Sequence, residues 1–145
     1  GSIGVYAGNT AGGTAVHAEG NATQARDKGG FVKAMAYIDP FRLAAEYVVH
    51  CYNSQPGGNA SSTAPCGITV TRTWDGIYTI DFGFKVENRF ISLTPRGHYG
   101  DSAGGGNGLR TGIVSSVIGN KVTVAFSQRD DPETTSDTAF YIIVY

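Results

Sequence analysis

The most informative stretch of the chain reads Ile68-Thr69-Val70-Thr71-Arg72-Thr73-Trp74-Asp75-Gly76-Ile77-Tyr78-Thr79-Ile80-Asp81-Phe82. Before Asp75-Gly76 the apolar residues alternate with Thr, and after it Tyr78, Ile80 and Phe82 fall on one face of an extended chain. An Asp-Gly pair between two alternating runs is a strong signal for a tight hairpin turn. The stretch therefore predicts an antiparallel β-hairpin that buries one face of its second strand.

Strand signals recur along the rest of the chain after residue 30. Further extended runs are expected at 31–38, 47–52, 90–94, 113–118, 121–126 and 139–145. Gly119-Asn120 has the composition of a second two-residue turn. The run 139–145 is almost entirely apolar and would aggregate at an open sheet edge, so we expect it to pair centrally. Residues 31–145 are therefore predicted to form an antiparallel β-sandwich, jelly-roll-like, of seven or eight strands.

The overall composition agrees with an all-β fold. The 145 residues include 21 Gly, 8 Tyr and 7 Phe but only three Leu, whereas a helical bundle is rich in Leu, Ala, Glu and Lys. A hydrophobic fraction of 41% is too high for a disordered chain. The net charge of −1 provides no basic field for nucleic acid, and no apolar run approaches the ~18–20 residues that span a bilayer. We therefore expect neither nucleic-acid binding nor membrane insertion.

The first 30 residues follow a different pattern from the rest. Gly4-Val5-Tyr6-Ala7-Gly8 is echoed 11 residues later by Ala15-Val16-His17-Ala18, with turn-forming residues between them. Each unit has too little apolar surface to fold alone and becomes stable by stacking on copies in neighbouring chains. We therefore divide the chain into a Gly-rich β-stem at 1–30 and a knob at 31–145, and we expect an oligomer. A Gly-rich tail without fixed structure is the alternative.

Two cysteines, Cys51 and Cys66, flank a polar loop rich in Gly, Pro and Ser. A disulfide between them would close a loop of about 15 residues and stabilise the fold by about 3 kcal/mol in the chain-entropy model. The alternative is a buried, free Cys51 and an unrelated Cys66, because two cysteines are weak evidence for an oxidising compartment. No Cys-x-x-Cys or His-x-x-x-His spacing occurs, so we expect no metal and no cofactor.

Two parts of the sequence carry side chains suited to surface recognition. The loop at 95–112 mixes aromatic, cationic and amide groups, and the single Trp precedes the Asp-Gly turn, where a hairpin tip could present it. Aromatic faces stack on sugar rings, and Arg and Asn hydrogen-bond hydroxyl groups. The alternative is that the Trp packs over the end of the sandwich and that 95–112 is an ordinary loop. The predicted ligand-binding residues are Trp74, Arg96, His98, Tyr99 and Asn107.

Catalytic motifs are missing from the sequence, so we expect a protein that is not an enzyme. His98, Asp101 and Ser102 lie within five residues of one another, whereas the members of a catalytic triad normally come from separate elements. A glycan hydrolase would need two carboxylates about 5–10 Å apart in a groove, and no pair stands out. The acidic residues at 130–137 could hold a hard cation, but a solvated loop is the simpler interpretation because the glycines of a calcium loop are absent.

Three segments resemble bacterial and phage fibre proteins. The repeat at 4–18 is similar to the short Gly-Val-Tyr-Gly repeats of trimeric β-helical stems. The hairpin at 70–82 resembles the start of the C-terminal knob domains of such fibres, and 137–145 resembles their closing strand. The resemblance implies a homotrimeric, virion-associated or extracellular tail fibre whose knob recognises a cell-surface glycan or surface protein during host attachment. A purely structural virion or matrix component and, second, a glycan hydrolase remain as alternatives.

Overall fold

The computed structural model describes residues 32–54, 61–96, 110–128 and 131–145. The predicted stem at 1–30 lies outside these ranges. In chain order the described elements are β1 (Ala34–Ile38), a 3-10 helix η1 (Ala44–Glu46), β2 (Val48–Asn53), β3 (Thr69–Trp74), β4 (Ile77–Asp81), β5 (Ile91–Arg96), β6 (Arg110–Ile118), β7 (Lys121–Gln128), β8 (Asp131–Thr135) and β9 (Ala139–Val144).

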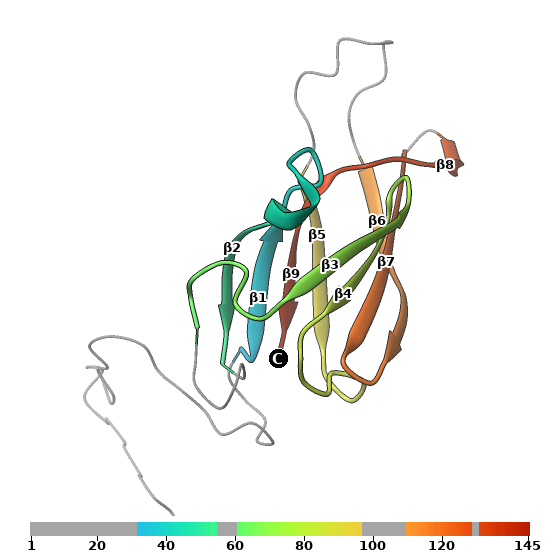
Figure 1. The fold of residues 1–145 in the computed structure, drawn as a ribbon. Coiled ribbons are helices and arrows are strands. Elements are labelled where there is room, and N and C mark those ends of the chain that lie inside the picture. Colours follow the sequence, from blue (N-terminus) through green and yellow to red (C-terminus); the bar gives the residue numbers. More distant parts are fainter. Residues whose placement is uncertain (1–31, 55–60, 97–109, 129–130) are drawn as a thin grey trace, which may run out of the picture.

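The strands form two antiparallel sheets that face each other (Figure 1). One sheet has the order β2-β1-β9-β5, and the other has the order β3-β4-β7-β6 with β8 paired to one end of β7. This arrangement confirms the predicted all-β sandwich. The described ranges contain nine strands, whereas seven or eight were expected. The additional strand is β8, which falls in a polar segment that sequence patterns assign to a loop.

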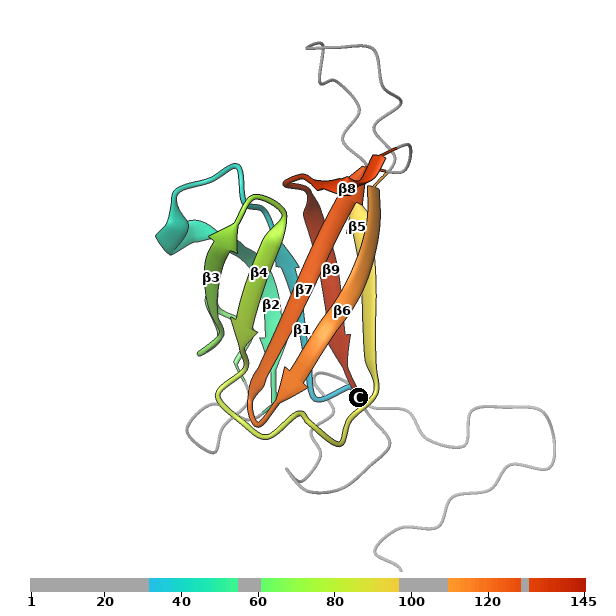
Figure 2. The ribbon, with the colours of Figure 1, turned by 90° about the vertical axis from the view of Figure 1, so that its right-hand side faces the viewer.

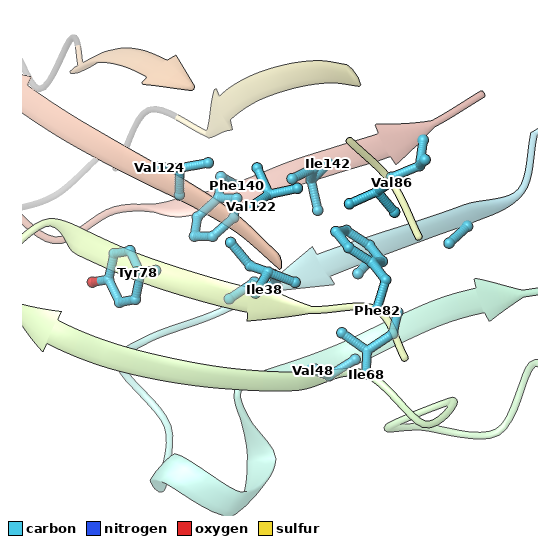
Figure 3. Close-up of a cluster of buried hydrophobic side chains, with 14 of the residues drawn as sticks. Ile38, Val48, Ile68, Tyr78, Phe82, Val86, Val122, Val124, Phe140 and Ile142 are labelled. Carbon is cyan, nitrogen blue, oxygen red and sulfur yellow. The ribbon is translucent and has the colours of Figure 1, made fainter. Parts of the chain in front are cut away.

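The core lies between the two sheets and is built from the inward-facing positions of both (Figure 3). Tyr78, Ile80 and Phe82 are fully buried, as the alternation in the hairpin predicts. The ring of Phe140 in β9 lies 5.6 Å from that of Tyr78 and 4.7 Å from that of Phe126 in β7, measured between centroids. Burial of an aromatic or branched side chain contributes about 1.5–3 kcal/mol, so these cross-sheet contacts hold the layers together.

Both predicted tight turns are present. Asp75-Gly76 connects β3 to β4, and Gly119-Asn120 connects β6 to β7. The closing strand β9 pairs with β1 on one side and with β5 on the other, so the expectation of a central position is also confirmed.

A disulfide closes one side of the sandwich. Cys51 in β2 is bonded to Cys66, which precedes β3, with the two Cα atoms 6.1 Å apart. The bond therefore joins the edge strand of one sheet to the edge of the other. Beside it, buried Asn53 donates through Nδ2 to the carbonyl oxygens of Cys66 and Phe82, each at 3.1 Å.

Loss of this disulfide is expected to lower the free energy of unfolding by about 3 kcal/mol, because the bond restricts the unfolded chain. Urea unfolding of the oxidised protein and of the Cys51→Ser/Cys66→Ser double variant measures the difference. A reducing agent should shift the midpoint of the wild type and leave that of the double variant unchanged. Equal midpoints for the oxidised wild type and the double variant would contradict the expectation.

Candidate functional site

Two of the five predicted ligand-binding residues, Trp74 and Arg96, lie in the part of the chain that the structure describes. Trp74 ends β3 beside the hairpin turn and is 70% exposed, so it does not pack over the end of the sandwich. Arg96 ends β5 in the other sheet. Both strand ends lie opposite the end of the sandwich that carries the start of β1 and the C-terminus (Figure 1). The remaining three residues, His98, Tyr99 and Asn107, lie outside the described ranges.

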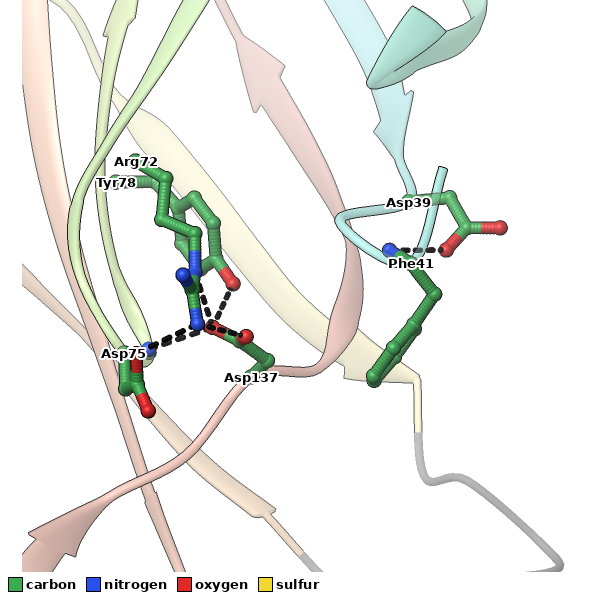
Figure 4. A network of polar contacts seen from close by, with 7 residues as sticks. Asp39, Phe41, Arg72, Asp75, Tyr78 and Asp137 are labelled. Carbon is green, nitrogen blue, oxygen red and sulfur yellow. Dashed lines mark hydrogen bonds and ion pairs between the residues drawn. The ribbon is translucent and has the colours of Figure 1, made fainter. Parts of the chain in front are cut away.

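The turn next to the tryptophan is held by a network around Asp137 (Figure 4). Arg72 donates to Asp137 from Nη2 at 2.5 Å and from Nε at 3.1 Å, and from Nη2 to Asp75 at 2.6 Å. The backbone N–H of Gly76 donates to the same Asp137 carboxylate at 2.7 Å, and the hydroxyl of Tyr78 donates to it as well. The network fastens the segment before β9 to the hairpin of β3 and β4.

The hydrogen bonds of this network determine the protonation states of Asp137 and Arg72. Burial raises the pKa of Asp137, but the hydrogen bonds from Arg72, Tyr78 and Gly76 outweigh burial and bring the pKa below its ordinary value. The hydrogen bond to Asp137 raises the pKa of Arg72, and burial raises that of Tyr78. At neutral pH the network therefore pairs a charged carboxylate with a charged guanidinium and a neutral phenol.

The acidic segment at 130–137 has no metal-binding arrangement in the part that the structure describes. Asp137 is occupied by the hairpin network, and Asp131 accepts a hydrogen bond from the hydroxyl of Thr134 at 2.5 Å. No group of three or more His, Cys, Asp or Glu side chains within the described ranges could hold a metal ion.

A row of ring-bearing side chains crosses the outer face of the sheet β2-β1-β9-β5. His50 in β2 is paired with Tyr37 in β1, Tyr37 with Tyr141 in β9, and Tyr141 with Thr94 in β5. Directly paired residues in neighbouring strands point to the same face, so four consecutive strands present these side chains side by side. We call His50, Tyr37 and Tyr141 the aromatic row.

The rings of the aromatic row are close and nearly parallel. The centroid of Tyr37 lies 4.8 Å from that of Tyr141, at an interplanar angle of 28°, and 6.2 Å from that of His50, at 22°. Arg96 reaches over the row, with its Cζ 5.4 Å from the Tyr37 centroid and Nη1 donating to the Tyr37 hydroxyl at 2.5 Å. This hydrogen bond raises the pKa of Arg96, so a cation lies over the ring of Tyr37.

A hollow of about 490 Å³ opens along the aromatic row. Its walls are mostly aromatic, aliphatic or sulfur-bearing side chains, and the imidazole and the Thr and Tyr hydroxyls are the polar groups among the described lining residues. None of the lining residues that the structure describes is acidic. The lining residues are Met35, Ala36, Tyr37, His50, Cys51, Thr94, Tyr141, Ile142 and Ile143.

Of the two predicted residues that the structure describes, Arg96 contributes to this surface and Trp74 does not, and the aromatic row itself was missed. The available signal was the alternation in 34–38 and 139–144, where Tyr37 and Tyr141 occupy the positions between buried residues. That signal does not reveal that the strands carrying Tyr37 and Tyr141 are neighbours. The structure shows that β1 and β9 are paired.

Comparison with known proteins gives no match to a protein-family model, to a curated protein or to a solved structure. Within the described ranges, no helix has the length and apolar character needed to cross a membrane. The functional argument therefore rests on the chemistry of the surfaces.

Proposed function

We propose that the protein is the receptor-binding tip of a homotrimeric, extracellular or virion-associated fibre, and that its knob binds a cell-surface glycan without transforming it. The observation that carries the glycan part is the aromatic row, with Arg96 above it and a hollow of about 490 Å³ beside it. The volume is within the ~300–1,000 Å³ range of small-ligand sites.

The chemistry of this surface matches that of a saccharide. A sugar ring has an apolar C–H face that packs on aromatic side chains, and its rim of hydroxyl groups takes part in hydrogen bonds. Here the rings and aliphatic groups provide the apolar wall, while Arg96, His50, Thr94 and the Tyr37 hydroxyl provide donors and acceptors. Because no carboxylate is found among the described residues that line the hollow, a neutral or acidic sugar is favoured over a cationic ligand.

The disulfide supports a position outside the cell. A bond between Cys51 and Cys66 persists in oxidising compartments and is rare in the cytosol. An open hollow on a sheet face gives weak binding per copy, and three linked copies would strengthen attachment through avidity. These two features favour a multivalent attachment protein over a monomeric enzyme. Asp75 and Asp137 are both ion-paired with Arg72 at the hairpin turn.

Replacement of Tyr141 by Ala is expected to weaken glycan binding about tenfold, because losing a stacking ring costs about 1–1.5 kcal/mol. A glycan array with the oxidised full chain identifies the ligand, and titration calorimetry of the best glycan compares variants. Phe41→Ala is the matched control: Phe41 is 54% exposed and Tyr141 46%, but Phe41 lies outside the hollow.

The same measurements distinguish the alternatives. Binding that is lost in Trp74→Ala and kept in Tyr141→Ala would move the site to the hairpin tip. A trimer that binds no glycan on the array would contradict the proposed glycan binding. It would favour the alternative that the protein is a purely structural component of a fibre or virion. Turnover of a bound glycan would favour the hydrolase.

A further inference from the structure

Arg96 is held beside the aromatic row by two contacts, one to its side chain and one to its backbone. Its Nη1 donates to the Tyr37 hydroxyl at 2.5 Å, and its Cζ lies 5.4 Å from the centroid of the Tyr37 ring. The hydroxyl of Thr138, a buried residue, donates to the backbone carbonyl oxygen of Arg96 at 2.9 Å. A side chain that is held in position before a ligand arrives loses less conformational entropy when it binds.

Most of the hydrogen-bonding capacity of this guanidinium is left for a ligand. A guanidinium carries five N–H donors in a planar fork. Among the described residues, Arg96 uses Nη1 toward Tyr37, and its Nε and Nη2 donate to none of them. The Nε–H and one Nη2–H point in the same direction. Two parallel donors of this kind match the oxygens of a carboxylate, a phosphate or the similarly shaped sulfate.

The carboxylate that acts electrostatically on Arg96 is already engaged by other groups. The hydrogen bond to Tyr37 is the largest cause of the raised pKa of Arg96, and Asp39 is a smaller one. The Asp39 carboxylate accepts from the backbone N–H of Phe41 at 3.2 Å and from Nε of Arg42 at 3.4 Å. Within the described part of the chain, the hollow also has no acidic lining residue. The positive charge of Arg96 is therefore available to an anionic ligand.

The side chain of Arg96 crosses the strand that carries Tyr141. It starts on β5, opposite Ala139 of β9, and ends at Tyr37 of β1, on the far side of β9. Ala139 and Tyr141 are two residues apart and point to the same face of the sheet. The guanidinium therefore lies beside the Tyr141 ring, which is 46% exposed and whose centroid is 4.8 Å from that of Tyr37. A sugar ring packed on Tyr141 would have one edge toward this cation.

We propose that this site selects an anionic sugar, whose carboxylate, sulfate or phosphate group is bound by Nε and Nη2 of Arg96 while its ring packs on Tyr141. The inference rests on the proposed glycan binding and adds the chemical class of the sugar and the residue that selects it. A neutral sugar binds through packing and ordinary hydrogen bonds, whereas an anionic sugar also gains a charge-assisted, bidentate contact. Because Arg96 is at the surface, we expect a preference of about fivefold, the upper range for an exposed ion pair.

The test compares sugars that differ by one anionic group. Sialyllactose and trigalacturonate are each compared with their methyl esters, and lactose sulfate and lactose phosphate are each compared with lactose. Titration calorimetry with the oxidised full chain should give the anionic member of at least one pair about fivefold higher affinity. The pair with the largest ratio identifies the anionic group. Sodium chloride at about 0.5 M should remove most of this preference, because salt screens charges that are exposed to solvent.

Variants assign the preference to a residue, and the readout is the ratio of the two affinities within a pair. Arg96→Gln should bring the ratio close to one, and Arg96→Lys should give an intermediate ratio, because an ammonium keeps the charge but lacks the fork. Tyr141→Ala should weaken both members alike and leave the ratio unchanged. Lys121→Gln is the charge-matched control: Lys121 is exposed at the start of β7, in the other sheet (Figure 2). Urea midpoints check that the variants fold.

The inference is overturned if both members of every pair bind equally, or if the ratio in Arg96→Gln remains that of the wild type. It is also overturned if the glycan array yields only neutral ligands, and in that case the proposed glycan binding stands. Absence of binding to every glycan, neutral or anionic, would instead be the failure of the proposed function. The two failures therefore give different results.

Discussion

Removal of residues 142–145 is expected to abolish folding. The truncation deletes half of β9, which lies between β1 and β5 in the middle of its sheet. Ile142 and Val144 are completely buried, and each such side chain contributes about 1.5–3 kcal/mol. The backbone pairing of Val144 with Ala34 and Ile91 is lost as well. Together these losses approach the ~5–15 kcal/mol by which a whole domain is stable.

The truncated chain should accumulate as insoluble protein and lack the near-ultraviolet circular dichroism of the wild type. Two point variants make the argument quantitative, because Ile142 and Ile143 are adjacent residues on opposite faces of β9. Ile142→Ala should lower the free energy of unfolding by about 2–5 kcal/mol by opening a cavity, and Ile143→Ala by less than about 1.5 kcal/mol. A soluble truncation with the urea midpoint of the wild type would contradict the central role of β9.

The features that could be predicted from the sequence are those encoded locally. The hairpin of β3 and β4 follows from alternation on both sides of Asp75-Gly76, and the central position of β9 follows from its uninterrupted apolar run. The polar strand β8 was wrongly assigned to a loop, because its pairing with β7 comes from backbone geometry rather than from apolar side chains. Whether Cys51 and Cys66 are bonded was left open, since it depends on a distance in space that spacing along the chain does not fix.

The candidate site was harder to predict for a physical reason. In β1 the small residues Ala34 and Ala36 face the core while Met35 and Tyr37 face outward, so the pattern of apolar residues does not separate the two faces. The aromatic row also depends on the register of β2, β1 and β9, and β9 is about 100 residues from β1 in sequence, so no local signal fixes that register. Arg96 was selected from its chemistry alone, without reference to its neighbours, and its role in binding stays a prediction.

Replacement of Gly76 by Ala is expected to destabilise the protein by about 3–5 kcal/mol, from the left-handed backbone and from overpacking against backbone atoms. Gly76 has a φ of 70°, and a Cβ there would lie 2.5 Å from the N of Ser136 and 2.7 Å from the carbonyl oxygen of Phe126. Neither atom can move freely, because the N–H of Phe126 donates to the carbonyl of Gly76 at 2.8 Å and that of Ser136 to Phe126 at 3.0 Å.

Gly119 separates the two causes of this effect. It occupies the other hairpin turn with a similar φ of 60°, but a Cβ there would meet no atom within 4 Å. Gly119→Ala should therefore cost only the conformational term of about 1–2 kcal/mol, and urea unfolding of the two variants isolates the steric part. Equal losses would mean that close packing around Gly76 contributes nothing. A larger loss in Gly76→Ala would show that the backbone of the turn beside Trp74 is held by close packing against the segment that carries Ser136 and Asp137.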